Sequence, residues 1–187
     1  MYQTGIPLVV VDIETAGLKV EHPIIQIAAV VVETGTWVEK ETFEVKLQFK
    51  VEEAIKEALE VNHFSPEAWK DAVPPGVAIR QFSRLLERHR FASRISKAGK
   101  PYQVAVACGY NSSFDSERLF YQARLHNIFL AVDPRFLDVM QLAFWRQLTL
   151  KSYKLTSVAE ELGISTANAH DALADVRMTI EVLKRLR

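Results

Sequence analysis

The chain has 187 residues, 49% of them hydrophobic and 25% charged, and its 23 basic side chains balance 23 acidic ones. This length and composition are typical of one globular domain with a sizeable core, and they exclude a mainly disordered chain. A lone cysteine, Cys108, excludes a disulfide scaffold. No signal peptide and no apolar run long enough to span a membrane are visible, so we expect a cytoplasmic protein without membrane contact.

Three strands are predicted near the N-terminus. Residues 7–11 and 24–32 are runs of mainly apolar residues, which are typical of buried strands. Over 43–49, apolar and polar residues alternate strictly, which is the period of a half-buried strand. Because only short turn segments separate the three, we expect an antiparallel meander.

Helical patterns dominate the rest of the chain, with one further strand predicted over 103–108. This order of elements predicts one α/β domain with a mixed sheet. We expect helices over 52–61, from Ser65 with Pro66 at the first helical position, and over 77–91, 113–126, 136–148, 155–162 and 170–186.

Positive charge is concentrated in one segment, residues 80–100. The segment holds seven basic residues and a single acid, Glu87. Such a cluster could attract phosphates. The alternative is a solvated helix face followed by a loop, and the charge alone leaves both open.

Two acids follow the first predicted strand. Asp12 and Glu14 are two residues apart, so in an extended segment their side chains project from one face. Their like charges repel unless a cation lies between them, and such oxygen ligands suit Mg²⁺ or Mn²⁺. The alternative is a pair of acids that caps the next turn.

Further acids lie at a strand end and at a helix start. Asp115 follows the strand predicted over 103–108, at the usual functional edge of an open α/β sheet, although it could simply occupy a first helical turn. Asp171 and Asp175 are four apart in the last helix and could share a face. His170 is expected at or before that helix's first turn, free to reach a neighbouring site or to act as a surface residue.

Taken together, these residues resemble the signature of the DEDDh (DnaQ-like) 3′→5′ exonucleases of the ribonuclease H-like fold. The flanks match as well, with Val-Asp-Ile-Glu-Thr-Ala-Gly-Leu at 11–18, Asn-x-x-Phe-Asp at 111–115 and Ala-His-Asp-Ala-x-x-Asp at 169–175. Within the family, the sequence is similar to ribonuclease T and the proofreading exonucleases, in part through Val-Asn-His-Phe-Ser-Pro at 61–66. The matching signature residues are Asp12, Glu14, Asp115, His170 and Asp175.

The resemblance implies one exonuclease domain over 1–187, with a ribonuclease H-like mixed sheet of an antiparallel three-strand meander plus parallel strands, flanked by helices. It implies release of nucleoside 5′-monophosphates from single-stranded RNA or DNA 3′ ends by a two-metal-ion mechanism, with His170 as general base. The expected metal ligands, for two Mg²⁺ or Mn²⁺ ions, are Asp12, Glu14, Asp115 and Asp175.

Substrate contacts are expected beside these carboxylates. Leu18 could wedge against the terminal base, whereas Phe114 could either stack on a base or pack in the core. The resemblance favours the interpretation of the basic segment as a surface that binds nucleic acid. That surface would serve one subunit or extend across the homodimer that ribonuclease T-like relatives suggest. The residues expected to contact the substrate are Thr15, Leu18, His63, Phe64, Asn111, Phe114, Arg84 and Arg88.

The sequence departs from the family pattern at two places. Tyr110 stands where the family often has histidine, and segment 62–64 lacks the glycine usual in ribonuclease T-like proteins. Two other functions are weighed against the exonuclease. One is a catalytically silent module that binds nucleic acid or a partner. The other is a phosphohydrolase of small phosphoesters, against which the extended basic segment argues.

Overall fold

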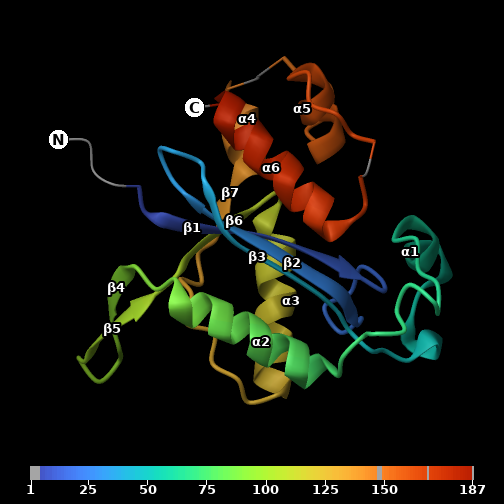
Figure 1. Cartoon of the computed structure of the whole chain (residues 1–187), viewed down its shortest axis with the longest axis horizontal. Helices are drawn as coiled ribbons and strands as arrows, with labels where there is room; N and C mark the ends of the chain where they lie inside the picture. The colour runs from blue at the N-terminus through green and yellow to red at the C-terminus, as the bar shows by residue number, and fades with distance from the viewer. Residues whose placement is uncertain (1–4, 147–148, 168, 187) are drawn as a thin grey trace.

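The computed structural model describes residues 5–146, 149–167 and 169–186. A five-stranded sheet lies between two layers of helices, and a two-stranded hairpin extends from one end of the molecule (Figure 1). In these ranges, none of the helices combines the length and the apolar character needed to cross a membrane.

The sheet has the strand order β3-β2-β1-β6-β7. β1 pairs antiparallel with β2, and β2 with β3, whereas β6 lies parallel to both β1 and β7. The predicted mixed sheet, a meander extended by parallel strands, is therefore confirmed. Its strands are β1 (Pro7–Thr15), β2 (Ile24–Glu33), β3 (Glu39–Lys46), β6 (Val106–Gly109) and β7 (Leu137–Asp138).

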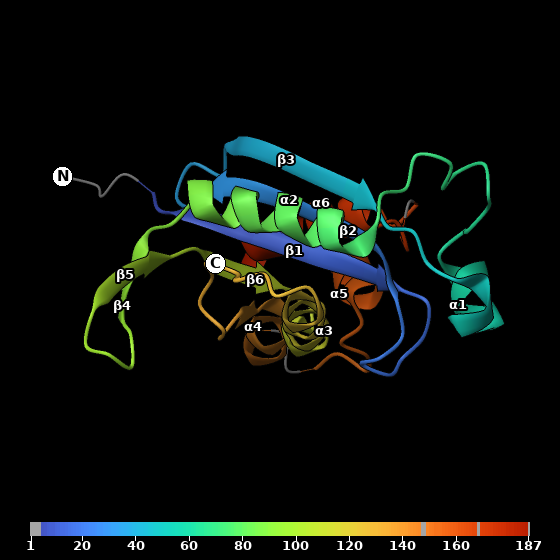
Figure 2. The same cartoon turned by 90° about the horizontal axis from the view of Figure 1, so that it is seen from below.

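Helices cover both faces of the sheet (Figure 2). α2 and α3 pack on one face and α4, α5 and α6 on the other, and each face has its own apolar core. The helices are α1 (Lys56–Val61), α2 (Pro75–Arg88), α3 (Ser112–Leu125), α4 (Val139–Arg146), α5 (Leu155–Glu161) and α6 (Ala172–Leu186).

The central strand β1 supplies side chains to both cores. Its odd-numbered residues from Val9 to Ile13 pack in the core beneath α2 and α3, whereas Leu8 and Val10 pack in the core beneath α6. Since side chains alternate along a strand, the next even-numbered residues, Asp12 and Glu14, project toward the α6 face.

Two helix predictions before α2 need correction. The helix predicted over 52–61 is split into a 3₁₀ turn, Val51–Glu53, and α1, because the Ile55 N–H donates to the Ala16 carbonyl at 2.8 Å. No helix begins at Ser65, where the chain forms only turns. Soon afterwards the chain is extended again, since the Val73 N–H donates to the Lys46 carbonyl at 2.9 Å.

The segment after α2 also differs from the prediction. The helix predicted over 77–91 ends at Arg88, and a hairpin of β4 (Ala92–Ile95) and β5 (Pro101–Val104) follows. The strand predicted over 103–108 is consequently two strands, β5 and β6, with Ala105 between them in a bridge to Val132. The helix predicted over 136–148 begins only at Val139, because the two preceding residues pair with β6, and its last two residues lie outside the described ranges.

Candidate active site

Four carboxylates converge from three elements of the fold. β1 supplies Asp12 and Glu14, the first turn of α6 supplies Asp175, and the first turn of α3 supplies Asp115. Single carboxylate oxygens of Asp12, Glu14 and Asp175 lie within 4.8 Å of one another. Asp115 is buried, and its Oδ1 accepts a hydrogen bond from the Ile13 N–H at 3.1 Å. Asp115 is thus fixed to the backbone between the two acids of β1.

Local sequence features bring α3 close to β1. A Cβ at Gly109 would lie 2.8 Å from the Val11 carbonyl oxygen, so only glycine allows this approach of β6. Asn111 then adopts a left-handed conformation with φ 56°, which asparagine tolerates better than most residues. Its N–H donates to Asp138 Oδ1 at 3.1 Å. The turn that these residues form places Asp115 one turn into α3.

The start of α6 is fixed by a capping acid. The Asp171 Oδ1 accepts a hydrogen bond from the Ala174 N–H at 3.0 Å, as expected of an acid at a helix N-terminus. Asp171 is also close enough to raise the pKa of Glu14. Asp171 therefore adds negative charge to the site while it shapes the turn that carries Asp175.

Burial and mutual repulsion raise the pKa values of these carboxyl groups. Burial first, and then the neighbouring carboxylates, raise the pKa of Asp12 well above its usual value. Burial and the charge of Asp175 raise the pKa of Glu14 to about 8. Burial raises the pKa of Asp115 to about 8, although the hydrogen bond from Ile13 acts in the opposite direction. The pKa of Asp175 is raised as well, mainly by burial.

The residues present fit a divalent cation. Asp175 Oδ1 is buried and has no hydrogen-bond partner among the residues that the structure describes, although an ionised oxygen normally acquires one. Carboxylate oxygens are the ligands that Mg²⁺ and Mn²⁺ prefer. A cation among Asp12, Glu14 and Asp175 would replace their repulsion by attraction and would partner the orphaned oxygen.

His170 lies at the edge of this cluster. The helix predicted over 170–186 begins only at Ala172, so His170 precedes α6 by two residues, with φ 70° and an exposed side chain. Its N–H donates to Asp175 Oδ2 at 3.3 Å. The backbone of His170 is thus tied to a candidate metal ligand, while its ring lies outside the cluster of ligand atoms that the described residues form.

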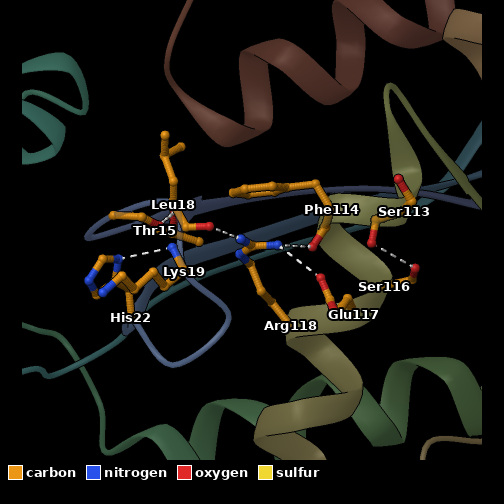
Figure 3. Close-up of polar contacts among 10 residues, drawn as sticks. Thr15, Leu18, Lys19, His22, Ser113, Phe114, Ser116, Glu117 and Arg118 are labelled. Atoms are coloured by element: carbon orange, nitrogen blue, oxygen red, sulfur yellow. Dashed lines mark hydrogen bonds and ion pairs between the residues drawn. The ribbon is translucent and has the colours of Figure 1, made fainter.

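An open cavity of about 530 Å³ adjoins the carboxylates, with Glu14 in its lining. Three of the predicted substrate residues, Thr15, Leu18 and Phe114, line the same cavity. Leu18 is 84% exposed, an unusual position for a leucine. Figure 3 shows Leu18 and Phe114 near each other, on the β1–β2 loop and on α3. The structure thus brings these three residues together beside the acidic site.

The segment 61–66 is only partly at this site. His63 lines a separate cavity of about 740 Å³ together with Asp171, and Phe64 packs between Phe49 and Trp69, with ring centroids 5.1 and 5.2 Å away. His63 has φ 50°, the left-handed conformation that glycine adopts most readily. This residue lies in segment 62–64, which lacks the glycine that the resemblance to ribonuclease T-like proteins leads one to expect.

Two further predicted substrate residues lie elsewhere. Arg84 and Arg88 are on the exposed side of α2, and α2 covers the face of the sheet opposite to α6. Arg88 forms an ion pair with Glu41 of β3. The structure therefore does not bring either arginine to the carboxylates of the same chain.

Two residues that the sequence analysis did not single out hold the site together. The Asn62 side chain is buried and donates to the Thr15 carbonyl at 2.9 Å, which links segment 61–66 to the end of β1. Arg118 is buried on α3 and contacts Leu18 and Phe114. The sequence does contain a signal for Arg118. In a helix, position 118 lies on the same stripe as Asp115, together with positions 119 and 122.

Comparisons with known proteins agree with this geometry. A family model named RNase_T and described as exonuclease matches residues 9–183. No curated protein matches the sequence. The nuclease domain of 3′hExo, a DEDDh family member bound to rAMP, superposes with a TM-score of 0.75 at 15% identity over 97% of this chain and 92% of that one.

Exonuclease I is similar as well. One of its structures has a TM-score of 0.74 at 19% identity, and the E. coli enzyme in complex with a dT13 oligonucleotide has 0.72 at 18% identity. Each match covers 97% of this chain and 40% of the exonuclease I chain. The chain thus spans about 40% of the length of those relatives, and at these identities the likeness shows a shared fold.

Proposed function

The chain belongs to the RNase_T exonuclease family, and we propose that it is a metal-dependent 3′→5′ exonuclease that releases nucleoside 5′-monophosphates from single-stranded RNA or DNA. One observation carries the proposal. Oxygens of Asp12, Glu14 and Asp175 gather within 4.8 Å, and Glu14 also lines an open cavity that holds Leu18 and Phe114. This arrangement fits a terminal nucleotide, because its phosphodiester would lie beside the carboxylates and the flat face of its base would lie against the apolar residues. Residues 1–187 would form one exonuclease domain.

Two divalent ions, Mg²⁺ or Mn²⁺, would be held by the four carboxylates. Asp12, Glu14 and Asp175 would hold the first ion, and Asp12 would be shared with the second, supported by Asp115. When bound, the ions would stabilise charge on the scissile phosphate and lower the pKa of a water molecule. The raised pKa values of the metal-free carboxyl groups support this assignment, because such a site gains most from a cation.

His170 would act as the general base. Its imidazole would take a proton from the water that attacks the terminal phosphorus, while the bond from phosphorus to the 3′-oxygen of the preceding nucleotide breaks. Two features support this role. The exposed side chain is free to turn toward a bound substrate, and the hydrogen bond from the His170 N–H to Asp175 keeps the residue beside the site.

The remaining substrate contacts would fall into two groups. Leu18, Phe114 and Thr15 would contact the terminal nucleotide in the cavity that they line. The exposed basic residues of α2, among them Arg84 and Arg88, would bind phosphates farther along the nucleic acid. Because α2 lies on the other face of the sheet, the second group would serve either a long strand or the site of a partner copy in a homodimer. Two of the similar structures support a nucleic-acid substrate, since exonuclease I is in complex with a dT13 oligonucleotide and the 3′hExo nuclease domain is bound to rAMP.

The remaining predicted contacts would lie at the edges of the site. Asn111 is exposed at the start of α3, and His63 lines the cavity next to Asp171. Phe64 is half-buried between two aromatic rings, so its contribution would be to hold segment 61–66 in place.

A degradation assay tests the function. The protein is incubated with 5′-labelled single-stranded RNA and DNA of one sequence, in Mg²⁺, in Mn²⁺ and in EDTA, beside Asp12→Ala. We expect a ladder that shortens from the 3′ end and is absent in EDTA and in the variant. Binding without any ladder in either metal would favour a catalytically silent module. Cleavage of small phosphoesters alone would favour the phosphohydrolase.

A further inference from the structure

Arg118 is a buried arginine that contacts two residues in the lining of the substrate cavity. It lies on α3 one turn after Asp115, and only 4% of the residue is exposed. Its Nη1 donates to the Phe114 carbonyl at 3.0 Å, and its Nη2 donates to the Leu18 carbonyl. The guanidinium carbon lies 3.4 Å from the centroid of the Phe114 ring (Figure 3). One side chain therefore contacts both residues that would hold a terminal base.

The stability of the fold alone does not account for this arginine. Burial lowers the pKa of Arg118, which reflects the unfavourable transfer of its charge out of water. Among the described residues, its ion pair is with Glu117 at 3.6 Å, and the Glu117 side chain is 64% exposed, while the charges of Asp115 and Glu21 also offset part of the cost of burial. The Arg118 Nε is buried with no hydrogen-bond partner. Since an apolar side chain would fill such a position without these penalties, the guanidinium must offer something that an apolar side chain lacks.

The guanidinium offers a rigid link between two segments. Leu18 belongs to the loop from β1 to β2. The Ala16 carbonyl at the start of this loop accepts from the Ile55 N–H at 2.8 Å, whereas the bond next to Leu18, from the Lys19 N–H to His22 Nδ1 at 3.1 Å, is local. The bond from Arg118 ties this loop to α3, about 100 residues later in the chain. The planar fork of arginine can serve two acceptors in fixed directions, which a flexible lysine cannot.

We propose that Arg118 is a positioning residue that sets the separation between Leu18 and Phe114, and with it the width of the slot for the 3′-terminal base. The guanidinium lies over one face of the Phe114 ring, and Phe114 also lines the cavity, where a base would contact it. The bond from Arg118 to the Leu18 carbonyl holds the exposed leucine at a fixed place across the cavity. The inference rests on the proposed function, because it assigns the cavity to a nucleotide at a strand end.

Binding without cleavage provides the test. Fluorescence anisotropy in EDTA compares two labelled single strands, one with an ordinary 3′-terminal nucleotide and one whose terminal nucleotide lacks its base. We expect the wild-type protein to bind the ordinary strand more tightly by five- to a hundredfold, about the value of one stacked base. Arg118→Met should remove this difference and leave affinity for the abasic strand within about twofold. Arg118→Lys, whose flexible ammonium lacks the planar fork of arginine, should keep part of it.

Matched variants separate a role in the slot from loss of charge or of folding. Arg124→Met removes an exposed positive charge from the same helix and should preserve the difference between the two strands. Leu18→Ala should remove the difference, and adding Arg118→Met to it should have no further effect. Equal weakening of both strands by Arg118→Met, or a preserved difference in that variant, would overturn the inference. Failure of the proposed function and failure of this inference can be told apart. The degradation assay measures cleavage, whereas the anisotropy measurement reports only the contribution of the terminal base to binding.

Discussion

Removing one carboxylate should stabilise the metal-free protein. The pKa of Glu14 is about 8, against 4.5 for an unperturbed glutamate. Between these values the folded state holds a proton that the unfolded state has lost, so the free energy of unfolding falls as pH rises through this window. Each pH unit is worth about 1.4 kcal/mol, so at pH 7 the proton that Glu14 retains in the folded state costs the protein about 3 kcal/mol of stability. Glu14→Gln should recover that amount and raise Tm by roughly 6–12 °C.

Thermal unfolding in EDTA at several pH values measures this effect. The variant and the wild-type protein should have equal stability near pH 4.5, and the advantage of the variant should grow toward pH 8. Glu87→Gln, which removes an exposed acid on α2, is the matched control and should leave Tm unchanged at every pH. Added Mn²⁺ should stabilise the wild-type protein at pH 8 and have much less effect on Glu14→Gln, which lacks one ligand. If Glu14→Gln has the same stability as the wild-type protein, or a lower one, at pH 7 in EDTA, the idea that the carboxyl group of Glu14 destabilises the metal-free fold is refuted.

Two further predictions concern the base and the basic segment. His170→Ala should lower the cleavage rate by roughly 10²–10⁴, while calorimetry shows Mn²⁺ binding unchanged; near-full activity would remove His170 from the mechanism. Arg84→Ala should weaken binding of a long strand and reduce the slope of log affinity against log salt by about one, whereas Arg88→Ala should have a smaller effect, because Arg88 is already paired with Glu41. A salt slope that is unchanged in Arg84→Ala would argue against a nucleic-acid track on α2.

Local periodicity determined the parts of the fold that were predicted correctly. The meander and the parallel strands followed from apolar runs and their separations, and the sheet order confirms them. The family assignment from the acidic motifs is confirmed by the match over residues 9–183. The failures occurred where distant pairing overrode local pattern. Val73 is extended because it bonds to Lys46, and residues 92–95 form a strand because the chain returns beside them at 101–104.

The candidate site divides in the same way. The sequence by itself placed Asp12 and Glu14 on one face of a strand, because side chains alternate every two residues, and it placed His170 at or before the first turn of the last helix. Only the tertiary structure decided that this face meets Asp175. Only the tertiary structure showed that Arg84 lies on the opposite side of the sheet. The same holds for Arg118, whose burial between a loop and a ring depends on segments about 100 residues apart. Periodicity is a property of neighbours in the chain, whereas the environment of a charged side chain depends on which elements the sheet order brings together.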